Sequence, residues 1–284
     1  MDDSKILITG AGGQLGLELQ KQYPNAQAAD ATELDITDLS ALERYDWSNI
    51  DVIINAAAYT NVDGAESPEG RIIAWQVNAN GPAHLAKIAA QHDIILVHIS
   101  TDYVFDGTHE LHTEDEALSP LSAYGQSKAA GDVAISVHSK HYIIRTSWVI
   151  GEGKNFVRTM LGLGQKGISP TVVADQIGRL TFTSELVRAI DHLLSTKASY
   201  GVYNVSNAGD SVSWAEITRT IFKEAGYNLE VTDTTTAEYF ANKEGVAPRP
   251  LQSTLALDKI QSTGFTSTDW RVDLKAYIEK ELKR

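Results

Sequence analysis

The sequence of 284 residues contains no cysteine, which excludes disulfides, thiolate metal sites, iron–sulfur clusters and cysteine nucleophiles. Basic residues are also scarce: 24 Lys and Arg stand against 37 Asp and Glu, a formal net charge of −13. Because phosphate backbones require basic faces, this balance argues against nucleic-acid and anionic-membrane partners. No apolar run is long enough to span a bilayer and no signal peptide is recognisable, so we expect a cytoplasmic protein.

What the chain does contain is a regular alternation of short β-branched apolar runs and helical stretches. Runs that are apolar at nearly every position favour strands buried on both faces of a parallel sheet. The alternation predicts an α/β fold, a Rossmann-type doubly wound parallel sheet with a smaller C-terminal region. The expected strands span 5–9, 51–55, 94–100, 142–146, 171–174 and 202–206, and the expected helices 14–22, 70–91, 122–139, 155–163, 184–194, 213–225, 236–243 and 274–282.

A glycine-rich turn follows the first expected strand directly. Gly10, Gly13 and Gly16 recur at every third position between that strand and the helix after it. The first glycine permits a tight turn, the second lets the backbone approach a pyrophosphate, and the third allows close helix–strand packing. The N–H groups at the start of the helix would then face the phosphates. The turn therefore predicts a dinucleotide site, with a purely structural glycine turn as the alternative.

The strand–helix alternation decays after about residue 228, which divides the chain into two expected parts. Residues 1–150, joined by 171–227, are expected to form the dinucleotide-binding domain. Residues 151–170 and 228–284 are expected to form a substrate-binding region.

Asp30 lies about 20 residues beyond Gly10, where an acidic side chain would accept a hydrogen bond from a ribose 2′-hydroxyl. No Lys or Arg stands between Asp30 and Arg44 to hold a 2′-phosphate. A turn aspartate is the alternative, because Asp is common in turns. Asp35 and Ile36 follow closely and are candidates to flank the adenine.

Small side chains follow the strand expected at 51–55, in the stretch Asn-Ala-Ala-Ala-Tyr-Thr at 55–60. Such residues at the carboxyl end of a strand would let a flat cofactor lie close to the backbone. Tight packing between helix and sheet explains the same residues equally well.

Tyr124 and Lys128 are four residues apart in an expected helix, so both lie on one face of it. An unperturbed tyrosine titrates near ~10, and a neighbouring ammonium lowers that pKa by stabilising the phenolate. The same lysine can hydrogen-bond ribose hydroxyls. The pair therefore predicts a proton-transfer site, with an ordinary surface pair as the alternative.

Two further expected strands end in candidate site residues, two hydroxyl-bearing residues in one case and a tryptophan in the other. Ser100 and Thr101 close one expected strand, where open α/β sheets place their sites, and either hydroxyl could bind a substrate carbonyl. A turn that caps local backbone is the alternative. Trp148 follows another expected strand and could form one wall of a substrate pocket. His109 and His112 lie among acidic residues, but their spacing matches no metal motif, so we expect a solvated loop and no metal site.

Together these motifs resemble the extended short-chain dehydrogenase/reductases, and within them the dTDP-4-dehydrorhamnose reductases. The glycine and Tyr/Lys motifs mark only the superfamily. More particular to the reductases are Ser-Thr-Asp-Tyr-Val-Phe-Asp-Gly at 100–107 and Arg-Thr-Ser-Trp at 145–148. The resemblance continues through Val-Asp-Gly-Ala-Glu at 62–66, Asn-Phe at 155–156, Asp-Gln-Ile-Gly at 175–178 and Arg-Pro at 249–250.

The resemblance assigns roles to residues that match its motifs. The implied catalytic residues are Thr101, Tyr124 and Lys128. The implied cofactor-binding residues are Gly10, Gly13, Gln14, Leu15, Asp30, Asp35, Ile36, Ala57, Ala58, Tyr59, Tyr124 and Lys128. The implied substrate contacts are Thr101, Asp102, Tyr124, Trp148 and Arg249.

The implied activity is reduction of the C4 ketone of dTDP-4-dehydrorhamnose to dTDP-L-rhamnose, with hydride from NADPH or NADH and a proton from Tyr124. A nucleotide-sugar substrate is then the expected partner, and the chain is expected to be a monomer or homodimer. Two alternatives stay open. One is a non-catalytic nucleotide-binding regulatory subunit, and the other is a different nucleotide-sugar reductase or epimerase of the same superfamily.

Overall fold

Six parallel strands form the central sheet of the computed structural model, which describes residues 2–284. Strands β1 (Ile6–Thr9) and β3 (Val52–Asn55) are buried along their whole length, as their largely apolar sequences require. The predicted doubly wound parallel sheet is confirmed. In spatial order the strands are β2 (Gln27–Ala29), β1 (Ile6–Thr9), β3 (Val52–Asn55), β4 (Ile95–Thr101), β5 (His141–Thr146) and β10 (Gly201–Asn204).

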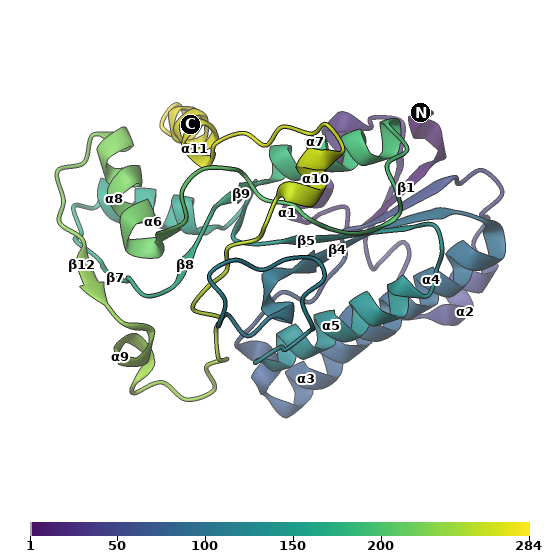
Figure 1. Ribbon diagram of the computed structural model, residues 1–284, viewed down its shortest axis with the longest axis horizontal. Helices are drawn as coiled ribbons and strands as arrows, with labels where there is room; N and C mark the ends of the chain where they lie inside the picture. The colour runs from purple at the N-terminus through teal and green to yellow at the C-terminus, as the bar shows by residue number, and fades with distance from the viewer. Residues whose placement is uncertain (1) are drawn as a thin grey trace.

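Helices cover both faces of this sheet (Figure 1). Their apolar sides pack on the strands in two separate buried clusters, one on each face. One face carries α1 (Gln14–Gln22), α7 (Thr183–Ser195) and α10 (Asp258–Ser262). The other carries α2 (Leu39–Arg44), α4 (Gly81–His92) and α5 (Ala123–Ser136), with α3 (Pro68–Trp75) beside α5.

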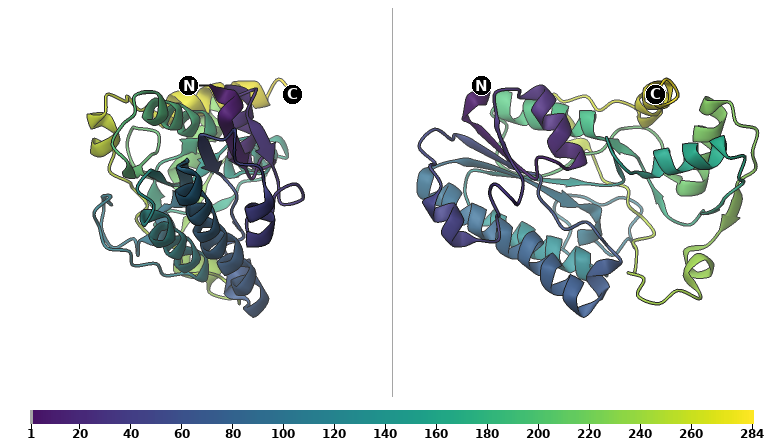
Figure 2. Two further views of the ribbon diagram at one scale, coloured as in Figure 1. Left: turned by 90° about the vertical axis from the view of Figure 1, so that its right-hand side faces the viewer. Right: turned by 180° about the vertical axis from the view of Figure 1, so that it is seen from behind.

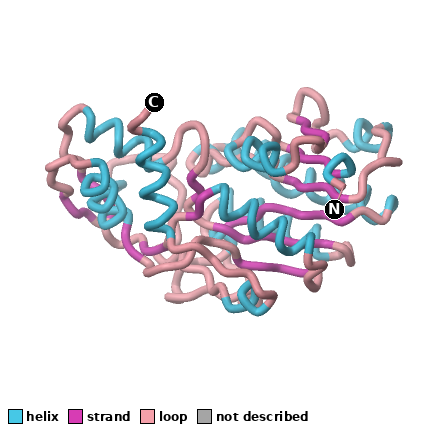
Figure 3. The backbone as a smooth tube through the Cα atoms, turned by 90° about the horizontal axis from the view of Figure 1, so that it is seen from above, coloured by secondary structure: helices cyan, strands magenta, loops and turns pink. Residues whose placement is uncertain are grey.

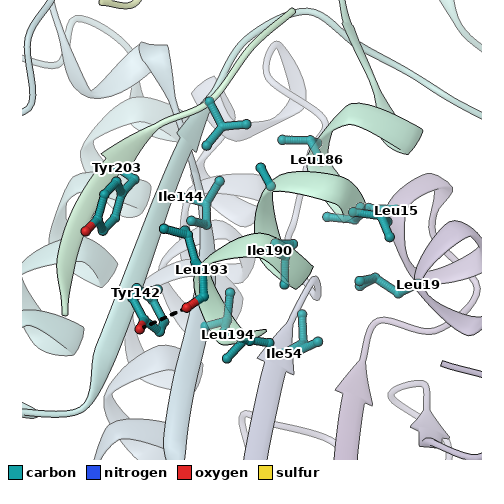
Figure 4. Close-up of a cluster of buried hydrophobic side chains, with 14 of the residues drawn as sticks. Leu15, Leu19, Ile54, Tyr142, Ile144, Leu186, Ile190, Leu193, Leu194 and Tyr203 are labelled. Carbon is teal, nitrogen blue, oxygen red and sulfur yellow. Dashed lines mark hydrogen bonds between the residues drawn. The ribbon is translucent and has the colours of Figure 1, made fainter. Parts of the chain in front are cut away.

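The cluster beneath α1 holds the start of that helix against the sheet. Figure 4 shows Leu15 and Leu19 of α1 beside Ile190 of α7, with Ile54 of β3 in the same cluster. Leu19, Ile54 and Ile190 are completely buried. Because α1 begins directly after the glycine-rich turn, this packing fixes the position of the turn at the end of β1.

A smaller region lies at one end of the sheet and has its own buried cluster (Figures 2 and 3). Its helices are α6 (Phe156–Gln165), α8 (Trp214–Ala225), α9 (Thr236–Phe240) and α11 (Trp270–Glu281). Short strand pairs join them: β6 (Val149–Ile150) with β9 (Thr181–Phe182), β7 (Thr171–Val173) with β12 (Thr232–Thr234), and β8 (Ile177–Gly178) with β11 (Val212–Ser213). Across residues 2–284, no helix has both the length and the hydropathy needed to cross a bilayer.

Two expected elements differ from the structure. The strand expected at 171–174 is β7, which pairs only with the exposed β12 and takes no part in the central sheet. The helix expected at 70–91 is interrupted by a π-helical stretch, Gln76–Asn80, between α3 and α4. The segment 171–227 is divided between the two regions. Helix α7 packs on the central sheet and β10 is one of its strands, whereas β7 and α8 contribute to the buried cluster of the smaller region. The expected domain boundaries stay a prediction.

Candidate active site

A cleft of about 670 Å³ opens where the carboxyl ends of β1, β3, β4 and β5 meet the smaller region. Parallel strands place their carboxyl ends at one edge of a sheet, and ligands of open α/β sheets bind there. The structure therefore brings together side chains that are far apart in the sequence. The expected site residues that line the cleft are Gly13, Gln14, Leu15, Ala58, Thr101, Asp102, Tyr124, Lys128 and Trp148.

The glycine-rich turn is shaped by close backbone contacts. Gly10 has φ of 72°, and a Cβ there would lie 2.6 Å from the backbone nitrogen of Ala57. A Cβ on Gly16 would lie 2.2 Å from the carbonyl oxygen of Gly10. Gly13 is the N-cap residue of α1, and no side chain caps that helix. The amides of its first turn can therefore receive an anion at the edge of the cleft.

The three residues expected near the adenosine half of a cofactor lie outside the cleft lining. Both carboxylate oxygens of exposed Asp30 accept from the Gly12 N–H, at 2.9 and 3.1 Å. Asp35 accepts from the amide and hydroxyl of Thr37, each at 2.8 Å. Ile36 is buried, in the cluster beneath α2 and α4. Asp30 thus braces the glycine-rich turn directly.

A buried asparagine that the sequence analysis did not single out holds the loop after β3. Asn78 lies in the π-helical stretch, accepts from the Tyr59 amide at 2.8 Å and donates to the Tyr59 carbonyl at 3.0 Å. It also donates to the Ser127 hydroxyl on α5 at 3.0 Å. A π-helical turn often marks a functional site. The local signal for this interruption is Gly81-Pro82 directly after it, since a proline lacks the N–H that a continuous helix needs.

Tyr124 and Lys128 lie in the first turns of α5, as their spacing predicts. Ser122 caps this helix by accepting from the Gly125 amide at 3.0 Å, and Glu66 accepts from the Ala123 amide at 2.8 Å. Both functional side chains are buried. Burial raises the pKa of Tyr124 well above its ordinary range. Burial lowers the pKa of Lys128 to about 8, because it removes the water that would stabilise the ammonium.

Thr101 and Asp102 form a buried hydroxyl–carboxylate pair at the end of β4. The Thr101 hydroxyl donates to Asp102 Oδ1 at 3.0 Å and accepts from the Tyr103 amide at 3.2 Å. Asp102 Oδ2 is buried without a hydrogen-bond partner among the described residues. Burial is the main cause that raises the pKa of Asp102 to about 6. A carboxyl group with this pKa can be protonated or charged near neutral pH.

Replacing Asp102 with asparagine is expected to stabilise the protein at pH 7.5. Between pH 3.8 and about 6 the folded protein keeps a proton on Asp102 that the unfolded chain has released. The free energy of unfolding therefore falls as pH rises through this window, by on the order of 3 kcal/mol. Thermal unfolding should show a higher Tm for Asp102→Asn at pH 7.5 and little change at pH 4.

Asp106→Asn is the matched control for that measurement. Hydrogen bonds from Thr108 hold the pKa of Asp106 below its ordinary value, so its ionised form is favoured and its replacement should bring no gain. An unchanged or lower Tm for Asp102→Asn at pH 7.5 would show that the buried carboxylate imposes no cost.

Trp148 both lines the cleft and packs into the smaller region. Its backbone has φ of 46°, and its indole stacks on Trp214 with ring centroids 3.8 Å apart. A Cβ on Gly178 would lie 2.9 Å from the indole. The ring therefore rests on Gly178 and joins the cleft to the aromatic cluster behind it.

That aromatic cluster borders a second pocket of about 350 Å³. Phe156, Trp214, Tyr239, Phe240 and Arg249 are among its lining residues. Only Arg249 was expected in a binding role. The aromatic residues carry no local signal of function, because such side chains are ordinarily core residues.

Arg249 forms an ion pair with the loop that follows β3. Its Nη2 lies 2.9 Å from each carboxylate oxygen of Asp63, which belongs to the loop after β3. The Asp63 carboxylate also accepts from the Ala247 amide at 3.0 Å. The guanidinium therefore borders the second pocket while it joins that loop to the smaller region.

Two further charged residues, Glu152 and Lys154, line the cleft. The loop that carries them is anchored to α1, because the Gly151 amide donates to Gln14 Oε1 at 2.9 Å. Hydrogen bonds from Arg284 and Lys280 hold the pKa of Glu152 well below its usual range. This glutamate therefore stays charged and secures α11 beside the cleft.

The histidines expected to lie in a solvated loop include one that is buried. His112 stacks on Phe105, and its Nδ1 lies 2.8 Å from a carboxylate oxygen of Glu116. Its Nε2 lies 3.1 Å from the Gln252 carbonyl oxygen. Over residues 2–284, no group of three or more His, Asp or Glu side chains is arranged to hold a metal ion. The expectation of a chain without a metal site stays a prediction.

The parallel sheet, the glycine-rich turn and the Tyr124/Lys128 pair at one cleft define an extended short-chain dehydrogenase/reductase. The family model described as RmlD substrate binding domain matches residues 4–283. The chain therefore belongs to this family of proteins.

The relatives cover nearly the whole chain. The spore coat polysaccharide biosynthesis protein SpsK of Bacillus subtilis (strain 168) is 38% identical over 98% of each chain. A dTDP-4-dehydrorhamnose reductase of Aggregatibacter actinomycetemcomitans is 38% identical over 97% of this chain and 100% of its own. The crystal structure of dTDP-4-dehydrorhamnose reductase from Bacillus anthracis str. Ames in complex with NADP has a TM-score of 0.88 at 37% identity, covering 97% of each chain.

Proposed function

We propose that this protein reduces the C4 ketone of dTDP-4-dehydrorhamnose to dTDP-L-rhamnose with NADPH or NADH. The observation that carries the proposal is the meeting of Thr101, Tyr124 and Lys128 in a cleft bordered by the glycine-rich turn on one side and Trp148 on the other. Relatives named for this reaction, one of them in complex with NADP, support the choice of substrate and cofactor.

The start of α1 fits the diphosphate of such a cofactor. Gly13 leaves the first-turn amides without a side-chain cap, and Gly13, Gln14 and Leu15 line the cleft. We assign Ala58, Tyr124 and Lys128 to the same cofactor site. Gly10, Ala57 and Tyr59 support it through the backbone contacts described above, and Asp30, Asp35 and Ile36 remain the proposed residues near the adenosine half.

A reduced nicotinamide, when bound, supplies the hydride for the ketone. Tyr124 donates its phenolic proton to the oxygen that becomes the alcohol, which is general acid catalysis. The Thr101 hydroxyl is the proposed second hydrogen-bond donor to that oxygen, and it must turn away from Asp102 to reach it. Lys128, when protonated, stabilises the Tyr124 phenolate left behind.

The substrate would lie between the two regions of the molecule. Asp102 and Trp148 are the proposed contacts of the sugar, because they line the cleft beside Tyr124. The aromatic second pocket has the flat apolar walls that suit a nucleoside base, and Arg249 at its edge is the proposed cation for the nucleotide end.

The direct test is ketone-dependent oxidation of NADH or NADPH with the 4-keto-rhamnose nucleotide, run beside a 4-keto-glucose analogue. We expect turnover with the first compound and little with the second. Absence of turnover with both, in a folded protein that binds the cofactor, would favour the regulatory-subunit alternative. Equal or better turnover of the analogue would favour another reductase of the superfamily.

Asp30 is expected to bias the choice between the two cofactors. Its carboxylate accepts hydrogen bonds from a free 2′-hydroxyl and repels a 2′-phosphate, so NADH should be used well and any preference for NADPH should be weak. Asp30→Ala should shift the ratio of kcat/KM values toward NADPH. Asp30→Asn is the matched control, because it removes the charge but keeps an acceptor for the Gly12 amide.

Comparing the two variants separates the effect of the Asp30 charge from the hydrogen bond by which Asp30 supports the glycine-rich turn. If charge sets the bias, both variants shift the ratio, and Asp30→Asn keeps the higher overall activity. A wild-type preference for NADPH beyond ~100-fold, about 2.7 kcal/mol, would instead show that a basic group reaches the 2′-phosphate and that Asp30 does not set the choice.

A further inference from the structure

Three polar side chains form a row across the sheet directly behind the cleft. Thr9 of β1 faces Asn55 of β3, and Asn55 faces His98 of β4, each pair in register on adjacent strands. All three side chains are buried. The row continues into the site, because His98 Nε2 lies 3.3 Å from Lys128 Nζ.

The backbone decides which way the Asn55 amide points. The Ala57 N–H, which can only donate, lies 3.2 Å from Asn55 Oδ1, and the Thr9 hydroxyl donates to the same oxygen at 2.8 Å. The Asn55 NH₂ group must therefore face His98 Nδ1, at 3.0 Å. Because an amide NH₂ can only donate, His98 Nδ1 must be an acceptor and carries no proton.

This arrangement fixes the tautomer of the imidazole. Burial holds the pKa of His98 well below its usual range, so the ring is neutral. A neutral imidazole whose Nδ1 accepts carries its proton on Nε2. That N–H is directed at Lys128 Nζ. This N–H repels a protonated Lys128, and it favours the neutral amine, whose lone pair can accept a hydrogen bond from it.

The other groups around Lys128 come from three elements, its own helix α5 and the strands β4 and β5. On its own helix, Tyr124 is neutral because burial raises its pKa, and Asp132 raises the pKa of Lys128 by its negative charge. Arg145 of β5 donates to Asp132 Oδ2 at 3.1 Å and so competes for that carboxylate. Lys128 also donates to the Ile99 carbonyl at 2.6 Å, which either charge state can do. Among these groups, His98 alone turns an N–H toward the lysine nitrogen.

We propose that His98, held by Asn55 with its proton on Nε2, is a positioning residue that favours the uncharged amine of Lys128 in the cofactor-free protein. The inference rests on the proposed function, in which Lys128 works as the ammonium beside Tyr124. The charge of Lys128 then depends on a residue that touches neither substrate nor cofactor.

The tautomer can be observed directly in cofactor-free protein labelled with ¹⁵N-histidine. Long-range ¹H–¹⁵N spectra distinguish a ring protonated on Nε2 from one protonated on Nδ1, and His98→Phe identifies the His98 signal. We expect the Nε2–H form, unchanged between pH 5 and 9. The Nδ1–H form, or a ring that titrates in this range, would overturn the proposal.

The charge of Lys128 is followed through the ¹³Cε resonance of labelled lysine, assigned with Lys128→Met. We expect a midpoint no higher than about 8 in the wild type. Asn55→Asp offers only acceptors, so His98 must move its proton to Nδ1 and turn a lone pair toward Lys128. The lysine midpoint should then rise by at least about one pH unit.

The carboxylate introduced by Asn55→Asp also attracts the Lys128 ammonium directly through space. To separate this effect, Asn55→Asp is also made in the His98→Phe variant, which keeps a ring but removes both nitrogens. If the effect passes through His98, the rise caused by Asn55→Asp should shrink by at least half in that background. An equal rise in both backgrounds would overturn the proposal. If Asn55→Asp fails to fold, the wild-type tautomer and midpoint still decide.

His138→Gln is the control for loss of a buried imidazole, since His138 Nε2 lies 2.8 Å from the Ile94 carbonyl, outside this row. It should leave the signals of His98 and Lys128 unchanged. All these measurements are made without cofactor or substrate, so their failure is distinct from a failure of the proposed function, which would appear as absent ketone reduction by the wild type.

Discussion

Replacing Tyr124 with phenylalanine is expected to lower kcat by about 10²–10⁴-fold, the usual contribution of a positioned general acid. The phenolic oxygen is the proposed proton donor in the cleft, and phenylalanine keeps the buried ring while it removes the proton. Because the ring remains, cofactor affinity and thermal stability should change little. Steady-state kinetics with the 4-keto-rhamnose nucleotide, together with a cofactor titration, measure both quantities.

Tyr203→Phe is the matched control for Tyr124→Phe. Tyr203 is also buried, but it lies in β10, at the edge of the sheet. Its hydroxyl donates to the Ser199 carbonyl at 2.6 Å. Its loss should leave kcat near the wild-type value. Activity of Tyr124→Phe within a few-fold of wild type would mean that the proton comes from another group.

Trp148→Ala is expected to destabilise the protein by less than the roughly 3–5 kcal/mol typical of a fully buried tryptophan, because the indole is only partly buried. The indole stacks on Trp214 and rests on Gly178, so truncation opens a cavity between the cleft and the smaller region. The same change should raise the KM for the nucleotide sugar, because the ring forms part of the cleft wall. Affinity for the cofactor should stay near that of the wild type.

Trp148→Phe separates the two roles of this side chain. A phenyl ring can still stack on Trp214, so most of the stability should return, whereas the shorter wall should leave the KM raised. Denaturant unfolding and kinetics on the same preparations give both values. A stable Trp148→Ala protein with unchanged kcat/KM would remove Trp148 from the proposed site.

The sequence was sufficient for features that depend on near neighbours in the chain. Unbroken apolar runs predicted β1, β3, β4, β5 and β10, since such runs are stable only when both faces are covered, but not the partly exposed β2. The spacing of Tyr124 and Lys128 predicted one helix face, and both side chains do line the cleft. The break at Gln76–Asn80 was not predicted, although Gly81 and Pro82 follow it directly and a proline lacks the N–H that a continuous helix needs.

By itself, then, the sequence determined the sheet class, the glycine-rich turn and the strand ends at which the cleft lies, because periodicity and turn chemistry act over a few residues. Only the tertiary structure decided which distant groups meet. It placed Asp30 on the Gly12 amide, joined Arg249 to Asp63, 186 positions away, and aligned Thr9, Asn55 and His98 behind Lys128. Strand order, register and packing decide such contacts, and these depend on the whole folded chain.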